Sequence, residues 1–219
     1  IGYDSALRLA VVKDRVYYVQ IDGAYDSVGP VVARARYPRC NGIPATIDLA
    51  VDGSQPSGAD DVIVGTEGND EIDGLDGNDT ICGFGGNDLI GSGPGDDYVV
   101  PGPGNDYLNG GVGVDTVSYR DLRSSGARVR FDLAIKMPQN TISSGNDRAS
   151  QFENLQGGSG NDILSGNTAD NLILGGPGND TLAGAAGNDR LDGGGGTDKC
   201  TGGPGTDTWA ACETLVGFP

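Results

Sequence analysis

The chain has 219 residues, a formal net charge of −17 and no histidine. Without histidine, the Ser-His and Cys-His pairs of common nucleophilic enzymes are excluded. The acidic excess argues against nucleic-acid binding, and no apolar stretch is long enough to cross a membrane. We therefore expect a protein that is not an enzyme and that has no nucleic-acid partner and no membrane span.

Residues 1–40 differ in composition from the rest of the chain, because they carry six basic and four acidic side chains. Residues 7–12 and 16–21 are apolar and β-branched and flank a charged turn, which predicts a β-hairpin. Residues 31–37 alternate and predict a third strand. Since forty residues cannot bury a core alone, this segment is predicted to cap a larger fold or to pair with another copy of the protein.

A nine-residue repeat fills residues 56–118 and returns over residues 157–210. Clear copies are Gly-Leu-Asp-Gly-Asn-Asp-Thr-Ile-Cys at 74–82 and Gly-Gly-Pro-Gly-Asn-Asp-Thr-Leu-Ala at 175–183. The sixth position is Asp in twelve of thirteen copies, and the eighth is usually large and apolar. The sixth-position residues are Asp61, Asp70, Asp79, Asp88, Asp97, Asp106, Asp115, Asp162, Asn171, Asp180, Asp189, Asp198 and Asp207.

Each position of the repeat has a physical role. Glycine reaches backbone conformations with positive φ at low cost, and aspartate supplies a hard oxygen ligand. The three residues around the apolar position form a short strand that sends one side chain inward. Two units then complete one turn of a flattened helix, and successive turns lie about 4.8 Å apart. One apolar side chain per unit makes a core only when the turns stack.

Stacking brings the loops of every second unit together, so that two carboxylates and several carbonyl groups face each other. This arrangement is repulsive without a cation, and Ca²⁺ prefers about six to eight such oxygens. Mg²⁺ fits less well, and the absence of histidine and the scattered cysteines argue against zinc. The alternative, that the aspartates only cap turns, does not require a nine-residue period.

These units resemble the RTX, or hemolysin-type, calcium-binding nonapeptide repeat, whose pattern is Gly-Gly-X-Gly-X-Asp-X-aliphatic-X. The resemblance covers 117 of the 219 residues. It implies an all-β protein, a right-handed parallel β-roll, with calcium between successive turns. Pairing each loop with the second loop after it, inside each block, implies roughly nine ions. Asn171 offers an amide oxygen without charge, so sites that share it are expected to be weaker.

The resemblance also implies a ligand set for these ions. It consists of the thirteen sixth-position side chains together with backbone carbonyl groups of the loops. The expected carbonyl ligands are those of Gly68, Gly74, Gly77, Gly83, Gly86, Gly95, Gly104, Gly175, Gly178, Gly187 and Gly196.

Residues 119–156 interrupt the repeat and are interpreted as an insert with enlarged coils inside one solenoid. Residues 127–134 alternate like a strand, and residues 142–150 are a degenerate unit that makes Asp147 a candidate ligand. Phe152 and Leu155 are expected to fill the core. The expected organisation is an N-terminal segment 1–40, a first roll block 41–118, the insert 119–156, a second block 157–210 and a C-terminal cap 211–219.

The four cysteines are expected to form disulfides Cys40–Cys82 and Cys200–Cys212, each near one end of the roll. Other pairings and free thiols remain as alternatives. Cysteine-bracketed repeats resemble stand-alone secreted bacterial proteins. No signal peptide is recognised, so Ile1 is either a processed terminus or the start of a fragment. Weak calcium sites fill only outside the cell, so we expect a secreted, extracellular or cell-surface protein that folds on binding calcium.

Three functions fit these observations. The first is a secreted calcium-binding structural protein that self-assembles into extracellular fibres or layers, with its N-terminal strands contacting other copies. The second is a calcium-dependent adhesin whose basic insert, including Arg128 and Arg130, binds a glycan or a protein. The third is a C-terminal secretion and folding module of a larger toxin or hydrolase.

Overall fold

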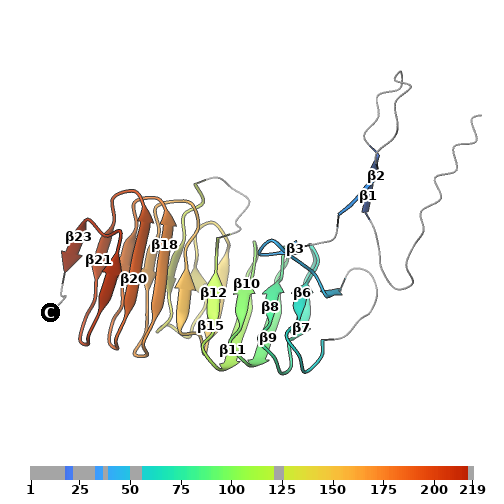
Figure 1. Cartoon of the computed structure of the whole chain (residues 1–219), viewed down its shortest axis with the longest axis horizontal. Coiled ribbons are helices and arrows are strands. Elements are labelled where there is room, and N and C mark those ends of the chain that lie inside the picture. The colour runs from blue at the N-terminus through green and yellow to red at the C-terminus, as the bar shows by residue number, and fades with distance from the viewer. Residues whose placement is uncertain (1–17, 22–32, 37–38, 50–55, 121–125, 217–219) are drawn as a thin grey trace, which may run out of the picture.

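A computed structural model describes residues 18–21, 33–36, 39–49, 56–120 and 126–216. Every regular element in this part of the chain is a β-strand. The strands from β5 onward stack along one axis as a flattened solenoid (Figure 1). Over the same residues, the structure has no helix of the length and apolarity that a membrane crossing needs. The prediction of an all-β, parallel β-solenoid is therefore confirmed.

One face of the solenoid is a continuous sheet of nine strands. In chain order these are β5 (Ile47–Asp48), β6 (Val62–Val64), β8 (Thr80–Cys82), β10 (Tyr98–Val100), β12 (Thr116–Ser118), β16 (Asn154–Gln156), β18 (Leu172–Pro177), β20 (Arg190–Gly195) and β22 (Thr208–Ala210). All neighbours in this sheet pair in parallel. Val99 pairs with Ile81 on one side and with Val117 on the other. This register of eighteen residues is the one that two nine-residue units predict.

The second face is divided into two sheets of five strands. The first contains β7 (Glu71–Asp73), β9 (Leu89–Pro94), β11 (Tyr107–Val112), β15 (Asn146–Ser150) and β14 (Gln139–Asn140). The second contains β13 (Arg130–Asp132), β17 (Ile163–Ser165), β19 (Thr181–Ala183), β21 (Lys199–Thr201) and β23 (Thr214–Val216). Strand β14 pairs antiparallel with β15, which ends the first of these sheets.

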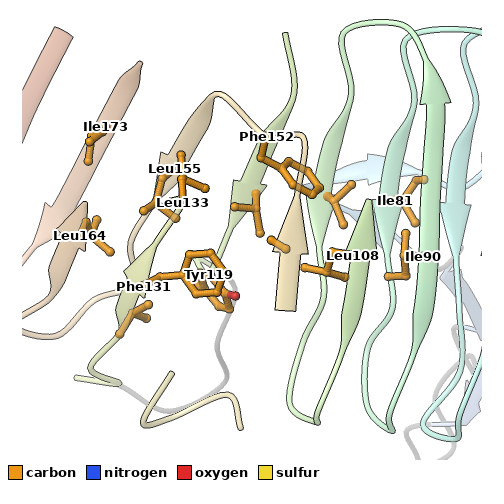
Figure 2. Close-up of a cluster of buried hydrophobic side chains, with 14 of the residues drawn as sticks. Ile81, Ile90, Leu108, Tyr119, Phe131, Leu133, Phe152, Leu155, Leu164 and Ile173 are labelled. Carbon is orange, nitrogen blue, oxygen red and sulfur yellow. The ribbon is translucent and has the colours of Figure 1, made fainter. Parts of the chain in front are cut away.

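The main core consists of side chains from both faces that meet between the sheets, shown in Figure 2 for its central part. A smaller buried cluster contains Cys40, Val64, Cys82 and Val100. The eighth-position residues from Ile63 to Cys200 are buried in it. Trp209 is an exception, because 44% of its surface is exposed. It lies on β22, the edge strand of the large sheet, where no following turn covers it. The eighth-position side chains of the other twelve units thus form the core, and that of the last unit lies at its end.

The insert supplies strands to both faces and the largest core side chains. Phe152 and Leu155 are buried, as predicted, and the alternating segment 127–134 buries every second residue. The rings of Tyr119 and Phe131 lie with their centroids 5.5 Å apart in the middle of the core (Figure 2). These aromatic residues fill the place where the second face passes from β15 to β13.

Short antiparallel pairs precede the roll. Strand β1 (Tyr18–Ile21) pairs with β2 (Ala33–Arg36), so a hairpin-like sheet is present near the N-terminus. The described partner of residues 18–21 is thus the predicted third strand, and the predicted strand 7–12 lies outside the described residues. Strands β3 (Arg39–Cys40) and β4 (Ile43–Pro44) form a second hairpin. Its two central residues, Asn41 and Gly42, both have positive φ, as two-residue turns of this type require.

Two disulfides join the ends of the roll to neighbouring strands. Cys40 of β3 bonds Cys82 of β8, with their Cα atoms 5.5 Å apart. Cys200 of β21 bonds Cys212, with a Cα separation of 5.9 Å. The structure therefore contains both predicted pairs.

Candidate metal centres

Each sixth-position side chain lies where a loop enters a strand, so stacking of the turns arranges these side chains in columns. Three columns result, and consecutive members lie on neighbouring turns. The long column is Asp61, Asp79, Asp97, Asp115, Glu153, Asn171, Asp189 and Asp207. The first short column is Asp70, Asp88, Asp106 and Asp147. The second short column is Asp162, Asp180, Asp198 and Glu213.

In each column, the aspartates after the first use one carboxylate oxygen to accept a hydrogen bond from the preceding turn. These bonds fix the register of the turns. The backbone N–H of Asp79 donates to Oδ1 of Asp97 at 2.8 Å, and that of Asp97 donates to Oδ1 of Asp115 at 3.0 Å. The same bond recurs along the three columns wherever the next turn carries aspartate. Because bonds from N–H groups to carboxylates are charge-assisted, they are stronger than ordinary backbone bonds.

The second carboxylate oxygen is buried and has no hydrogen-bond partner in ten of these residues. They are Asp79, Asp88, Asp97, Asp106, Asp115, Asp147, Asp180, Asp189, Asp198 and Asp207, each through Oδ2. Burying an ionised oxygen that has no partner costs roughly several kcal/mol of free energy. Each of these atoms therefore marks a place where a cation would offset a large desolvation cost.

We call a loop open when its sixth-position Oδ2 lacks a partner, and closed when a protein group satisfies that atom. The closed loops are the first of each column and the loop of Asn171. In them the backbone N–H of the second residue donates to the side chain of the sixth, as Thr66 N–H does to Asp70 Oδ2 at 2.6 Å. The other closed bonds are Ser57 to Asp61, Gly158 to Asp162 and Asn167 to Asn171.

In the open loops the second residue has positive φ, even where it is not glycine. Leu75, Phe84 and Ala185 have φ of 71°, 70° and 80°. None of the second residues of the closed loops has a positive φ. Positive φ in residues with a side chain costs roughly 1 kcal/mol or more. The open form is thus a distinct backbone state, which leaves Oδ2 available.

Where the first residue of an open loop is glycine, it borders the available oxygen. A Cβ added to Gly83 would touch Asp88 Oδ2 and would lie 2.5 Å from the carbonyl oxygen of Pro101 on the next turn. Gly175 has the same neighbours, Asp180 Oδ2 and the carbonyl oxygen of Gly193. Glycine at this position therefore keeps open a space that carboxylate and carbonyl oxygens line.

Carbonyl oxygens of the loops also face the following turn. The carbonyl groups of Gly77, Gly86 and Gly178 point at the glycine eighteen residues later. Within the described residues, no three Asp, Glu, Cys or His side chains converge on one point. A metal ion would therefore take most of its ligands from the backbone, which suits Ca²⁺ and excludes a zinc cluster of side chains in this part of the chain.

Burial changes the acid–base properties of the columns. Desolvation raises the pKa of Asp79, Asp88 and Asp180 from 3.8 to about 6, and neighbouring carboxylates add to the increase. For Asp106 burial raises the pKa to about 7. These shifts belong to the ion-free roll, and a cation at the same oxygens would compete with the proton.

Sequence reasoning missed two members of the columns, Glu153 and Glu213. Each follows a shortened loop, since the apolar positions flanking it are six residues apart rather than nine. The longer glutamate side chain makes up the distance, and its Oε2 accepts the N–H of Asp115 at 3.0 Å or of Asp198 at 2.6 Å. The available signal was the matching sequence Phe-Glu-Asn-Leu at 152–155 and Cys-Glu-Thr-Leu at 212–215.

At Asn171 the long column continues through hydrogen bonds between neutral groups. Its Nδ2 donates to the carbonyl oxygen of Glu153 at 2.6 Å, and Nδ2 of Asn167 donates to the carbonyl oxygen of Phe152 at 3.0 Å. The two side-chain amide groups thus donate hydrogen bonds to carbonyl oxygens of the shortened loop. We call this contact the asparagine joint, since it connects the two repeat blocks on the continuous face.

The fold and the columns define a β-roll whose loops are built for hard cations. The family of RTX calcium-binding nonapeptide repeats matches the chain in four copies, at residues 57–90, 91–119, 152–182 and 174–208. These matches cover more than half of the chain, which therefore belongs to the RTX calcium-binding repeat family. The comparison with curated proteins found no match to the chain.

Proposed function

We propose that the protein is a calcium-dependent structural protein that works outside the cell and is not an enzyme. The observation that carries the proposal is the set of ten buried Oδ2 atoms without a partner. The proposed ligands are the thirteen sixth-position side chains and the loop carbonyl groups, with Asn171 acting through its amide oxygen. Nine stacked loop pairs of the repeat blocks would hold about nine ions.

Chemistry and redox state support the extracellular location. Extracellular calcium modules bind with dissociation constants of about 10⁻⁴–10⁻³ M, a range in which the cytosol would leave them empty. The two disulfides also fit an oxidising compartment. The binding free energy of the ions would contribute directly to folding, because without ions the neighbouring carboxylates within each column repel one another.

The proposed organisation is one solenoid made of residues 41–118, 119–156 and 157–210, with segments 1–40 and 211–219 at its ends. Self-association through the N-terminal strands is part of this proposal, because among the described residues β1 and β2 pair only with each other, and an unpaired strand edge invites pairing with another chain. Sedimentation at millimolar calcium tests it, and a protein that stays monomeric would contradict assembly.

Circular dichroism during a calcium titration of metal-stripped protein tests the main proposal. We expect β-signal to increase near millimolar calcium and to respond far less to magnesium, which demands a tighter octahedron. A spectrum that shows folded β-structure in chelator and does not change with calcium would contradict it.

A calcium-dependent adhesin is a second candidate, supported by an open hollow on the insert. Arginine and apolar groups occur together there, a combination that suits a polar ligand with a hydrophobic face. The lining residues are Arg130, Ile135, Pro138, Gln139 and Asn140. Loss of glycan-array binding in the Arg130→Gln variant, with calcium binding unchanged, would favour this function over a purely structural one.

A further inference from the structure

The number of open loops exceeds the number of stacked pairs in the repeat blocks by one. In each of the nine pairs, the loop that follows in the chain is open, and this accounts for nine of the ten partnerless Oδ2 atoms. The tenth belongs to Asp147, in the insert, where the family match is interrupted between residues 119 and 152. The insert therefore contains a loop in the same state as those of the repeats.

The loop of Asp147 reproduces the open loops although its sequence departs from theirs. Ile142 has φ of 72°, the value found at the second residue of other open loops but here at the first. Asp106 N–H donates to Asp147 Oδ1 at 3.0 Å, across 41 residues of sequence instead of 18. Asn146 N–H likewise donates to Asn105 Oδ1 at 2.8 Å, as loop neighbours do throughout the roll. The stacking of this loop on the loop of Asp106 is thus the same as in the repeats.

This position has oxygen atoms that the repeat loops lack. Tyr119 is 1% exposed, and its hydroxyl group lies beside the carboxylate of Asp147. Asp106 also lies near this hydroxyl group. Thr141 and Ser144 are buried beside them, and the Ser144 hydroxyl contacts the carbonyl oxygen of Gly102.

Arg148, which follows Asp147 on strand β15, does not neutralise the carboxylates of Asp106 and Asp147. The guanidinium group of Arg148 lies over the ring of Tyr107, 4.4 Å from its centre. Asp147 is fully buried. A buried carboxylate beside a second one requires either a proton or a cation.

We propose that a further calcium ion binds between residues 102–106 and 142–147, with Asp106 and Asp147 as its acidic ligands and the Tyr119 hydroxyl beside it. This inference rests on the proposed calcium-binding function. The ion would join the insert to the first short column and so hold the largest core side chains, Tyr119 and Phe131, in place. Its occupant is the same ion as in the repeats, bound by residues outside them.

Native mass spectrometry of the full chain in calcium counts bound ions individually and tests the proposal. Asp147→Asn keeps the acceptor for Asp106 N–H and removes the charge, so it should bind one ion fewer than the unaltered protein. Asp180→Asn, in a repeat loop that belongs to two stacked pairs, should lose at least one ion. Asp76→Asn changes an exposed aspartate outside the columns and should lose none.

The outcomes separate this inference from the proposed function. An unchanged ion count in Asp147→Asn, together with a loss in Asp180→Asn, would overturn the further site and leave the function intact. Absence of bound calcium in the unaltered protein would overturn both.

A second measurement guards against misfolding of the Asp147 variant. Terbium bound in place of calcium emits when a nearby tyrosine is excited, so Tyr119→Phe should lower the emission per bound ion. Equal emission from Tyr119→Phe and from the unaltered protein would show that no ion lies beside Tyr119, and would overturn the proposal.

Discussion

Replacing Gly83 by alanine tests whether the space beside Asp88 holds an ion. The added Cβ would touch Asp88 Oδ2 and lie 2.5 Å from the carbonyl oxygen of Pro101, both proposed calcium ligands. The φ of Gly83 is outside the positive range, so alanine adds no backbone strain of that kind. The substitution therefore acts by filling the site.

Gly91→Ala is the matched control, in the same nine-residue unit. A Cβ at Gly91 has no neighbouring atom within 4 Å, and its φ is also outside the positive range. Glycine-to-alanine changes at compatible positions stabilise by about 0.4–1 kcal/mol through the unfolded chain. We expect Gly91→Ala to be neutral or slightly stabilising.

The magnitude follows from linkage between binding and folding. At a calcium concentration about 100 times the dissociation constant, one site contributes about 2.7 kcal/mol to the free energy of unfolding. In a domain of this size that corresponds to a decrease of roughly 5–10 °C in Tm. Each bound ion also makes the free energy of unfolding rise by about 1.4 kcal/mol for each tenfold increase in calcium.

Urea unfolding at two saturating calcium concentrations, one ten times the other, separates the lost ion from the steric clash. Gly83→Ala should show a calcium dependence smaller than that of the unaltered protein by about 1.4 kcal/mol per tenfold change. Gly91→Ala should retain the full dependence. If Gly83→Ala is destabilised but keeps the full calcium dependence, the clash alone is responsible and no ion occupies that space.

Two further predictions concern protons and disulfides. Because burial raises the pKa of Asp79 and Asp88 from 3.8 to about 6, the metal-free roll binds protons more tightly than the unfolded chain. Stabilisation by these protons is complete below pH about 4 and is lost as pH rises through about 6. Metal-free protein should therefore gain β-signal in circular dichroism when it is acidified from pH about 7.5 to 5. A loss of β-signal on acidification would contradict this prediction. Replacing both cysteines of the Cys40–Cys82 disulfide by serine should reduce the free energy of unfolding, measured by urea titration, by about 4 kcal/mol. The same replacement at Cys200–Cys212 should reduce it by about 3 kcal/mol, because this disulfide closes a shorter loop. Variants as stable as the parent would show that neither crosslink restrains the unfolded chain.

The repeat period was sufficient to predict the stacking. Once nine residues contain one loop and one strand, the eighteen-residue register of Ile81, Val99 and Val117 follows from geometry. The same period predicted that the sixth-position side chains align. It could not predict that, in the open loops, one carboxylate oxygen bonds the preceding turn while the other has no partner, since this depends on the backbone state of the loop.

Departures from the period were harder to predict. Glu153 and Glu213 join the columns through loops three residues shorter, which a search at fixed spacing passes over. The pairing of Tyr18–Ile21 with Ala33–Arg36 joins two of the three predicted N-terminal strands, whereas the predicted turn at 13–15 lies outside the described residues. Trp209 occupies the eighth position of its unit, but its side chain is exposed because this unit lies at the end of the stack of turns. The sequence of a single unit does not show where the stack ends.

The columns also give the roll a linear charge density. At most levels the long column and one short column run side by side, so with turns about 4.8 Å apart the ion-free roll has one column side chain about every 2.4 Å along its axis. Duplex DNA has one charge about every 1.7 Å and holds a condensed layer of counterions. By analogy, we expect the ion-free roll to attract monovalent cations, which calcium would displace on binding. Folding should therefore respond to ionic strength as well as to calcium concentration.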